Sequence, residues 1–227
     1  MPSLDTLLQF FGLTVLLALS PGPDNLFVLM QSIQHGWRTG LLVVLGLCLG
    51  VCLHTLAVAM GLAALLAASP QLLTLLKLLG AAYLLWLAWG AWHAPVAARA
   101  PEAMLPAGQA QPAATPAPAR ASNPRQALRC IGRGLVMNLS NPKVLLFFLA
   151  FLPQFAHPAR GPVAAQVVVL GAVFALSTLL VFGSIAFFSG SFGQALQRSA
   201  RMQRVLNRSA SIVFAALALR LLIAQVQ

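Results

Sequence analysis

The chain has 227 residues, of which 59% are hydrophobic and only 7% are charged. A mean hydropathy of +0.86 is too high for a soluble globular protein of this size. The formal net charge of +11 would suggest a nucleic-acid partner in a soluble chain, but membrane proteins also collect Lys and Arg in their cytoplasmic loops. The composition therefore predicts a polytopic membrane protein and excludes a soluble globular one.

The first apolar run, residues 4–30, is interrupted at residues 20–24, which read Ser-Pro-Gly-Pro-Asp. Two prolines and a glycine cannot continue an α-helix without losing backbone hydrogen bonds, and hydrocarbon contains no water to replace those bonds. Asp24 is also one of only three acidic residues in the chain. We therefore expect one interrupted transmembrane helix, residues 4–19 and 25–33, whose break faces a protein-lined cavity.

Two further spans complete the first half of the chain. Residues 35–38 (His-Gly-Trp-Arg) are expected to form a turn, and the apolar run that follows, residues 41–68, is long enough to cross the membrane at a tilt. Residues 72–92 form the third predicted span, and three tryptophans near its end are typical of a helix anchored at the membrane interface. Residues 1–93 are thus predicted to form a first three-helix repeat.

Residues 94–123 have a different composition, which is dominated by proline and alanine. Such a segment cannot form a hydrophobic core, so we expect a disordered linker. Residues 124–227 form the second predicted repeat, with one span that continues through a second break to Phe155, one at residues 163–188 and one at residues 205–223. The sequence therefore predicts an all-α protein with six transmembrane helices in two halves of three.

Arginines are distributed unevenly between the two sides of this predicted topology. If six spans alternate in direction, ten arginines flank the spans on one side and only Arg160 lies in a loop on the other. The positive-inside rule makes the arginine-rich side cytoplasmic, which places both termini outside and the 94–123 linker in the cytoplasm. Because these arginines flank spans and form no separate domain, no nucleic-acid partner is expected. The ten are Arg38, Arg99, Arg120, Arg125, Arg129, Arg133, Arg198, Arg201, Arg204 and Arg208.

Three spans per half is an odd number, so the second half must enter the membrane in the opposite direction from the first. This is the geometry of an inverted repeat, in which interrupted helices at matching positions mark the substrate site of secondary transporters. The second break, residues 140–143, reads Ser-Asn-Pro-Lys and lies at the matching place. If Pro23 and Pro142 each begin a helix, Asp24 and Lys143 each occupy the second position of that helix.

Asp24 and Lys143 are the main candidate site residues, and each has a structural alternative. A carboxylate suits the positive end of a helix dipole, so Asp24 could act only as a capping residue. A lysine there is disfavoured unless an anion accompanies it, and either Asp24 or a substrate carboxylate would serve. Lys143 could instead extend to the cytoplasmic interface. Charged residues within membrane spans are nevertheless functional candidates by default.

A histidine in the second span is a further candidate. Gly46, Gly50 and His54 are spaced by four residues and lie on one helix face. The glycines permit another helix to approach closely and would bring His54 toward the protein interior. There the imidazole could titrate during proton transport, or it could serve only as a hydrogen-bonded packing residue.

Three stretches carry a resemblance to a known family: Ser-Pro-Gly-Pro-Asp-Asn-Leu-Phe-Val-Leu at residues 20–29, the glycine-spaced second span, and Asn-Pro-Lys followed by Phe-Phe-Leu-Ala-Phe-Leu-Pro-Gln-Phe at residues 147–155. In combination they resemble the lysine-exporter and homoserine/threonine-resistance (LysE/RhtB) family, across both halves of the chain. The family motifs fall on Pro21, Gly22, Pro23 and Asp24, and on Asn141, Pro142 and Lys143.

The resemblance implies an exporter of amino acids or their derivatives in the bacterial inner membrane, driven by the proton gradient. Its partners would be a small amino-acid substrate, protons and the lipid bilayer, with no cofactor, and neither the exact substrate nor the oligomeric state is fixed. Cys48, Cys52 and His54 leave export of metal ions or thiol compounds as an alternative, although a closed metal site needs further ligands. A membrane scaffold and an intramembrane enzyme are alternatives from other classes, but one histidine and one aspartate give thin support for catalysis.

Overall fold

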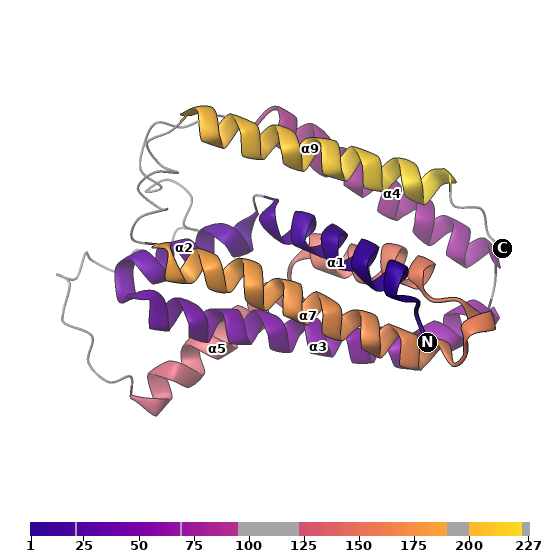
Figure 1. Ribbon diagram of the computed structural model, residues 1–227, viewed down its shortest axis with the longest axis horizontal. Coiled ribbons are helices and arrows are strands. Elements are labelled where there is room, and N and C mark those ends of the chain that lie inside the picture. The colour runs from indigo at the N-terminus through magenta and orange to yellow at the C-terminus, as the bar shows by residue number, and fades with distance from the viewer. Residues whose placement is uncertain (21, 69, 95–122, 190–199, 224–227) are drawn as a thin grey trace.

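The computed structural model describes residues 1–20, 22–68, 70–94, 123–189 and 200–223. All regular elements within these residues are helical, and the long helices lie side by side along one axis (Figure 1). The predicted linker, apart from its two end residues, and Pro21 and Arg198 lie outside the described residues. The elements are α1 (Leu4–Leu19), α2 (Pro23–His35), α3 (Trp37–Ala68), α4 (Pro70–Trp92), α5 (Pro124–Leu139), α6 (Pro142–Leu146), the π-helix η1 (Phe147–Phe151), the 3₁₀ helices η2 (Leu152–Phe155) and η3 (Pro158–Arg160), α7 (Val163–Phe187) and α9 (Ala200–Ile223).

Several of these helices have the length and composition of membrane spans. Three single stretches are long and apolar enough to cross a bilayer: Trp37–Gly61, Val163–Phe187 and Gln203–Ile223. Two bent pairs raise the number to five if each pair is one span: α1 with α2, at 64°, and α5 with residues 142–155, at 53°. Within α4, the apolar stretch Leu78–Trp92 is shorter. The prediction of an all-helical membrane protein is therefore confirmed, and a bent helix pair occurs at each of the two predicted breaks.

One predicted boundary was wrong, and two predicted spans differ from the structure in detail. The expected turn at residues 35–38 is reduced to Gly36, whose φ of +87° lies in a region that favours glycine. The helix α9 starts at Ala200, so Arg201 and its neighbours belong to the helix, while its apolar span begins at Gln203, close to the predicted residue 205. After the second break, α-helix continues only to Leu146 and then widens into η1. Such π-helical segments are rare and are frequently found at functional sites.

The two halves of the chain pack against each other in a reciprocal pattern. If each bent pair counts as one helix, the second helices of the halves contact each other (α3 with α7), and so do the third helices (α4 with α9). The first helix of each half contacts the second helix of the other, α1 with α7 and α5 with α3. In Figure 1, α1 and α5 begin at opposite ends of the bundle. Each half thus packs its first helix against the second helix of the other.

Glycine allows α3 and α5 to touch through their backbones. A Cβ atom added to Gly46 would lie 2.1 Å from the carbonyl oxygen of Ile131, and one added to Gly134 would lie 2.2 Å from the carbonyl oxygen of Val43. No larger residue fits at either position without moving a helix. Small residues at helix crossings are the usual way in which membrane helices pack closely. The close approach expected at Gly46 is therefore present.

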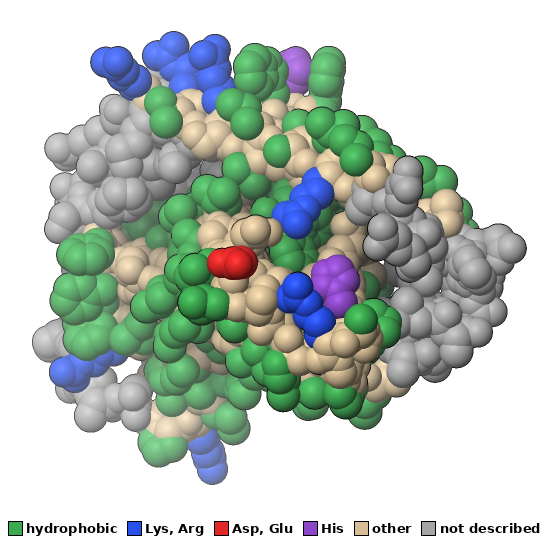
Figure 2. Space-filling model, turned by 45° about the vertical axis from the view of Figure 1, so that its right-hand side comes forward, with side chains coloured by type: hydrophobic (Ala, Val, Ile, Leu, Met, Phe, Trp, Pro, Cys, Tyr) green, Lys and Arg blue, Asp and Glu red, His purple; other side chains and the backbone are tan. Residues whose placement is uncertain are grey.

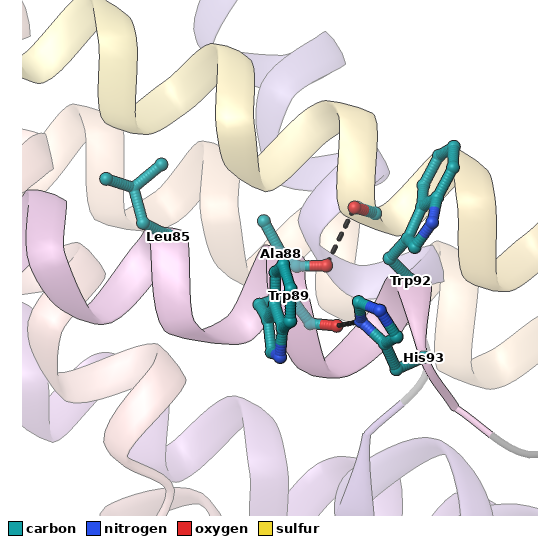
Figure 3. Close-up of a pocket in the computed structure, with 6 residues that line it drawn as sticks. Leu85, Ala88, Trp89, Trp92 and His93 are labelled. Atoms are coloured by element: carbon teal, nitrogen blue, oxygen red, sulfur yellow. Dashed lines mark hydrogen bonds between the residues drawn. The ribbon is translucent and has the colours of Figure 1, made fainter.

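The outer surface of the bundle is largely apolar. Hydrophobic side chains cover much of the face shown in Figure 2, where Lys and Arg side chains are few. Trp86, Trp89 and Trp92 near the end of α4 are exposed, as expected for an interfacial belt. Trp89 and Trp92 also line an open groove of about 530 Å³ between α4 and α9, where Ser211 donates a hydrogen bond of 2.7 Å to the carbonyl oxygen of Ala88 (Figure 3). The groove therefore has the composition of a membrane-interface surface.

Candidate functional site

The two helix breaks meet inside the bundle. Asn141, the N-cap residue of α6, accepts a hydrogen bond of 3.0 Å from the backbone N–H of Lys143 through its side-chain oxygen. Its side-chain nitrogen donates a bond of 2.8 Å to Oδ2 of Asp24, which is only 2% exposed. Pro23 and Pro142 begin their helices, so Asp24 and Lys143 occupy matching second positions, as expected. Asn141 thus joins the second break to the carboxylate of the first.

Lys143 replaces hydrogen bonds that the first break removes. Its Nζ atom donates to the carbonyl oxygens of Leu17 and Ser20, at 3.2 and 3.3 Å. In a continuous helix the Leu17 oxygen would accept the N–H of residue 21, but that residue is proline and has none. Gly22 leaves room for the ammonium group, because a Cβ added there would lie 3.2 Å from Nζ. Lys143 is only 7% exposed, so its side chain lies inside the bundle.

Asn25 has a similar role at the first break. Its Nδ2 atom donates a hydrogen bond of 2.8 Å to the carbonyl oxygen of Ala18, another backbone acceptor near the end of α1. Within the described part of the chain, Asp24 and Lys143 share no direct hydrogen bond. Asn141 links them, because it donates to the carboxylate of Asp24 and accepts from the backbone N–H of Lys143. The ammonium group of Lys143 therefore donates to backbone carbonyl oxygens, and the carboxylate of Asp24 accepts from a side-chain amide.

Buried polar atoms without partners gather around the two breaks. In the described part of the chain, five buried side-chain atoms lack a hydrogen-bond partner. Leaving such an atom unsatisfied costs about 1–3 kcal/mol, so a cluster of them calls for water or a polar ligand. Three lie at the first break, and the other two are on residues that flank the second break. The atoms are Ser20 Oγ, Asp24 Oδ1, Asn25 Oδ1, Asn138 Oδ1 and His54 Nε2.

His54 lies in the interior, as its spacing from the glycines predicts. A Cβ added to Gly50, one turn earlier on α3, would lie 2.5 Å from Oδ1 of Asn138, so the helix crossing holds Asn138 against α3. The imidazole is 8% exposed and stacks on Phe148, with 5.4 Å between ring centroids and 26° between planes. The structure therefore places His54 beside the π-helical segment that follows the second break.

The sequence analysis missed Asn25 and Phe148. Asn25 had a usable signal, because it is a polar residue directly after Asp24 in an apolar run. Phe148 had none, because it is one of 13 phenylalanines and only the folded chain places it on His54. Cys48 Sγ lies 3.7 Å from the carbonyl oxygen of Ala175, and Cys52 is exposed. No group of three metal-ligating side chains was found among the described residues.

Asn141→Ala is expected to destabilise the protein, because it removes both the cap of α6 and the hydrogen bond to Asp24. The loss should correspond to about 2 kcal/mol or more and appear as a lower melting temperature in detergent. Ser140→Ala is the matched control, since Ser140 is the exposed neighbour on the same break. Equal melting temperatures for the two variants would contradict this role of Asn141.

Comparison with known proteins assigns the chain to a family. Residues 15–225 match the family described as LysE type translocator. The chain belongs to this family. The resemblance to the LysE/RhtB family is thereby confirmed, and this LysE family member is a transporter in the membrane, not an enzyme. No solved structure matches it.

Relatives of this LysE family member include named efflux proteins. A leucine efflux protein of Enterobacter sp. is 31% identical, over 90% of this chain and 89% of the relative. A homoserine/homoserine lactone efflux protein of Salmonella typhimurium is also 31% identical, over 76% of this chain and 75% of the relative. An uncharacterised membrane protein of Pseudomonas aeruginosa is 35% identical over 76% of this chain and 74% of the relative.

Proposed function

We propose that this LysE family member exports amino acids or their derivatives from the cytoplasm across the bacterial inner membrane, by proton antiport with alternating access. The observation that carries the proposal is the cluster of unpartnered polar atoms around Asp24 and Lys143, buried in a chain with an apolar exterior. A scaffold has no need for such a cluster. The efflux proteins among the relatives support the same class of substrate.

The proposal includes six spans arranged as two inverted repeats, residues 1–93 and 124–227. The two bent pairs and the reciprocal packing of the halves support this arrangement. Arg125, Arg129 and Arg133 are exposed on α5. The helices α3, α5 and α9 begin at the same end of the bundle (Figure 1). In this topology that end is cytoplasmic, both termini are outside and the linker is in the cytoplasm.

Asp24 and Lys143 suit the two charged groups of an amino acid. The substrate carboxylate would bind the ammonium group of Lys143, which in this structure donates to the carbonyl oxygens of Leu17 and Ser20. The substrate ammonium would donate to Oδ1 of Asp24, which has no partner, and to the carbonyl oxygens that Lys143 leaves. Interrupted helices in secondary transporters hold zwitterionic substrates in this way, with backbone groups and charges at the break.

The carboxylate of Asp24 also provides a route for proton coupling. Protonation from the outside would remove the negative charge that holds the substrate ammonium, so the substrate would leave and the protonated carrier would return. Release of the proton to the cytoplasm would restore the charge for the next substrate. His54, beside the second break, is a further candidate for proton transfer in the same cycle.

The direct test is efflux from cells that express the chain and are loaded with a panel of dipeptides, with and without a protonophore. Dipeptides release amino acids inside the cell, so export of each residue can be followed in the medium. We expect selective export that the protonophore abolishes. With the protein confirmed in the membrane, absence of export across the panel would contradict amino-acid transport, and export that is insensitive to the protonophore would contradict proton coupling.

A further inference from the structure

The groove between α4 and α9 joins an apolar surface to a positive charge. Leu85, Trp89 and Trp92 of α4 line its apolar part (Figure 3). The two tryptophans are 69% and 53% exposed, so their rings are available to a molecule outside the bundle. The guanidinium group of Arg208, on α9, lies over the ring of Trp92, 5.4 Å from its centroid. A cation is therefore in contact with the wall of an apolar groove.

Two further arginines of α9 lie on the same side of the helix as Arg208. Ser211 lines the groove and donates its hydrogen bond to the carbonyl oxygen of Ala88, so this face of α9 is turned toward α4. Arg208, Arg204 and Arg201 precede it by three, seven and ten residues, a spacing that keeps side chains on one helix face. All three arginines are exposed. They form a row on the face of α9 that borders the groove, called the basic row below.

The basic row continues beyond the end of α4. That helix ends at Trp92, which Arg208 covers, and Arg204 and Arg201 lie about 6 and 10 Å further along α9. Neither helix contains an acidic residue, so the row gives this end of the groove a net positive charge. The groove thus presents apolar rings and cations in succession along one line, which is the pattern of an amphiphilic ligand.

We propose that this groove binds an anionic phospholipid, with the headgroup phosphate on the basic row and an acyl chain against Leu85, Trp89 and Trp92. Basic pockets between membrane helices recognise anionic headgroups by charge, and tryptophan rings lie at the level of the headgroups. A small soluble anion would use the arginines alone, whereas a phospholipid uses both parts of the groove. The inference does not depend on the transport activity proposed above.

Lipid binding to the purified protein tests the proposal. Protein in detergent is titrated with phosphatidylglycerol or with phosphatidylcholine of the same acyl chains, and native mass spectrometry gives the dissociation constant of each lipid. We expect phosphatidylglycerol to bind about tenfold or more tightly than phosphatidylcholine. The double variant Arg201→Gln, Arg208→Gln should weaken phosphatidylglycerol binding about 30-fold, because the basic row loses two of its three charges.

The matched control is the double variant Arg125→Gln, Arg129→Gln, which removes two exposed arginines from α5. It should leave the dissociation constant of phosphatidylglycerol unchanged. Both double variants should melt at the wild-type temperature without added lipid, because the side chains that they alter are exposed. Equal weakening of lipid binding by the two double variants would contradict a defined site, since a diffuse basic surface would produce that result.

Trp92→Ala tests the apolar part of the groove. It removes an acyl-chain contact and the ring beneath Arg208, so phosphatidylglycerol binding should weaken about tenfold. Trp86→Ala, at an exposed position of α4 that does not line the groove, should leave binding unchanged. Millimolar inorganic phosphate should not displace the lipid. Displacement by inorganic phosphate, equal binding of the two lipids, or equal effects of the two tryptophan variants would overturn the inference.

Discussion

Replacing Asp24 with Asn is expected to abolish export driven by the proton gradient while the protein still inserts in the membrane. The variant keeps the size of the side chain and an oxygen that can accept the hydrogen bond now donated by Asn141. It removes the charge that the substrate ammonium is proposed to meet and the group that is proposed to carry the proton. The pair that is lost is the Asp24 carboxylate with the substrate ammonium. Losing one member of a buried charged pair costs about 2–5 kcal/mol of binding free energy, which corresponds to a fall in transport of about 30-fold or more.

The control for this prediction is Asp5→Asn, which makes the same change at an exposed position in the first turn of α1. Both variants should appear in the membrane fraction in wild-type amounts, and only Asp24→Asn should lose export in the presence of a proton gradient. If Asp24→Asn exports as the wild type does, Asp24 has no coupling role and serves only as the acceptor of the hydrogen bond from Asn141.

Lys143→Met is the second substitution with a large expected effect. It retains much of the length and apolar character of the side chain but removes the ammonium group. Apparent affinity for the substrate should fall about 30-fold or more, because the substrate carboxylate would lose its charged partner. Stability should fall too, because the carbonyl oxygens of Leu17 and Ser20 lose their donor, at about 1–3 kcal/mol for each buried acceptor.

Two measurements separate these effects. The concentration dependence of transport gives the apparent affinity, and the melting temperature in detergent gives the change in stability. Arg133→Met is the matched control, since it removes one positive charge from an exposed position on α5. A lower melting temperature with unchanged apparent affinity would mean that Lys143 only donates hydrogen bonds to the carbonyl oxygens at the first break and does not bind substrate.

The positions of the two breaks could be predicted from sequence, because proline and glycine restrict the backbone locally. Pro23 and Pro142 begin helices where expected, and this places Asp24 and Lys143 at matching positions. The burial of His54 could be predicted from the glycine spacing. The absence of a side chain at Gly50 lets Asn138 approach this face of α3 closely, and His54 lies on the same face.

The partners of Lys143 could not be predicted from sequence. The hydrogen bonds of its ammonium group go to the carbonyl oxygens of Leu17 and Ser20, which every residue possesses and no residue type identifies. The change to π-helix after Leu146 also had no local signal, because Phe-Phe-Leu-Ala-Phe is compatible with an ordinary α-helix.

The most direct test of the central claim uses purified protein in proteoliposomes with an imposed pH gradient. Radiolabelled amino acid is offered on one side, and its movement is recorded together with the internal pH. Antiport predicts that the gradient drives amino-acid accumulation in the compartment that supplies protons, and that a protonophore abolishes the accumulation. Equal amino-acid movement with and without the gradient, in liposomes that hold folded protein, would contradict proton-coupled export around Asp24 and Lys143.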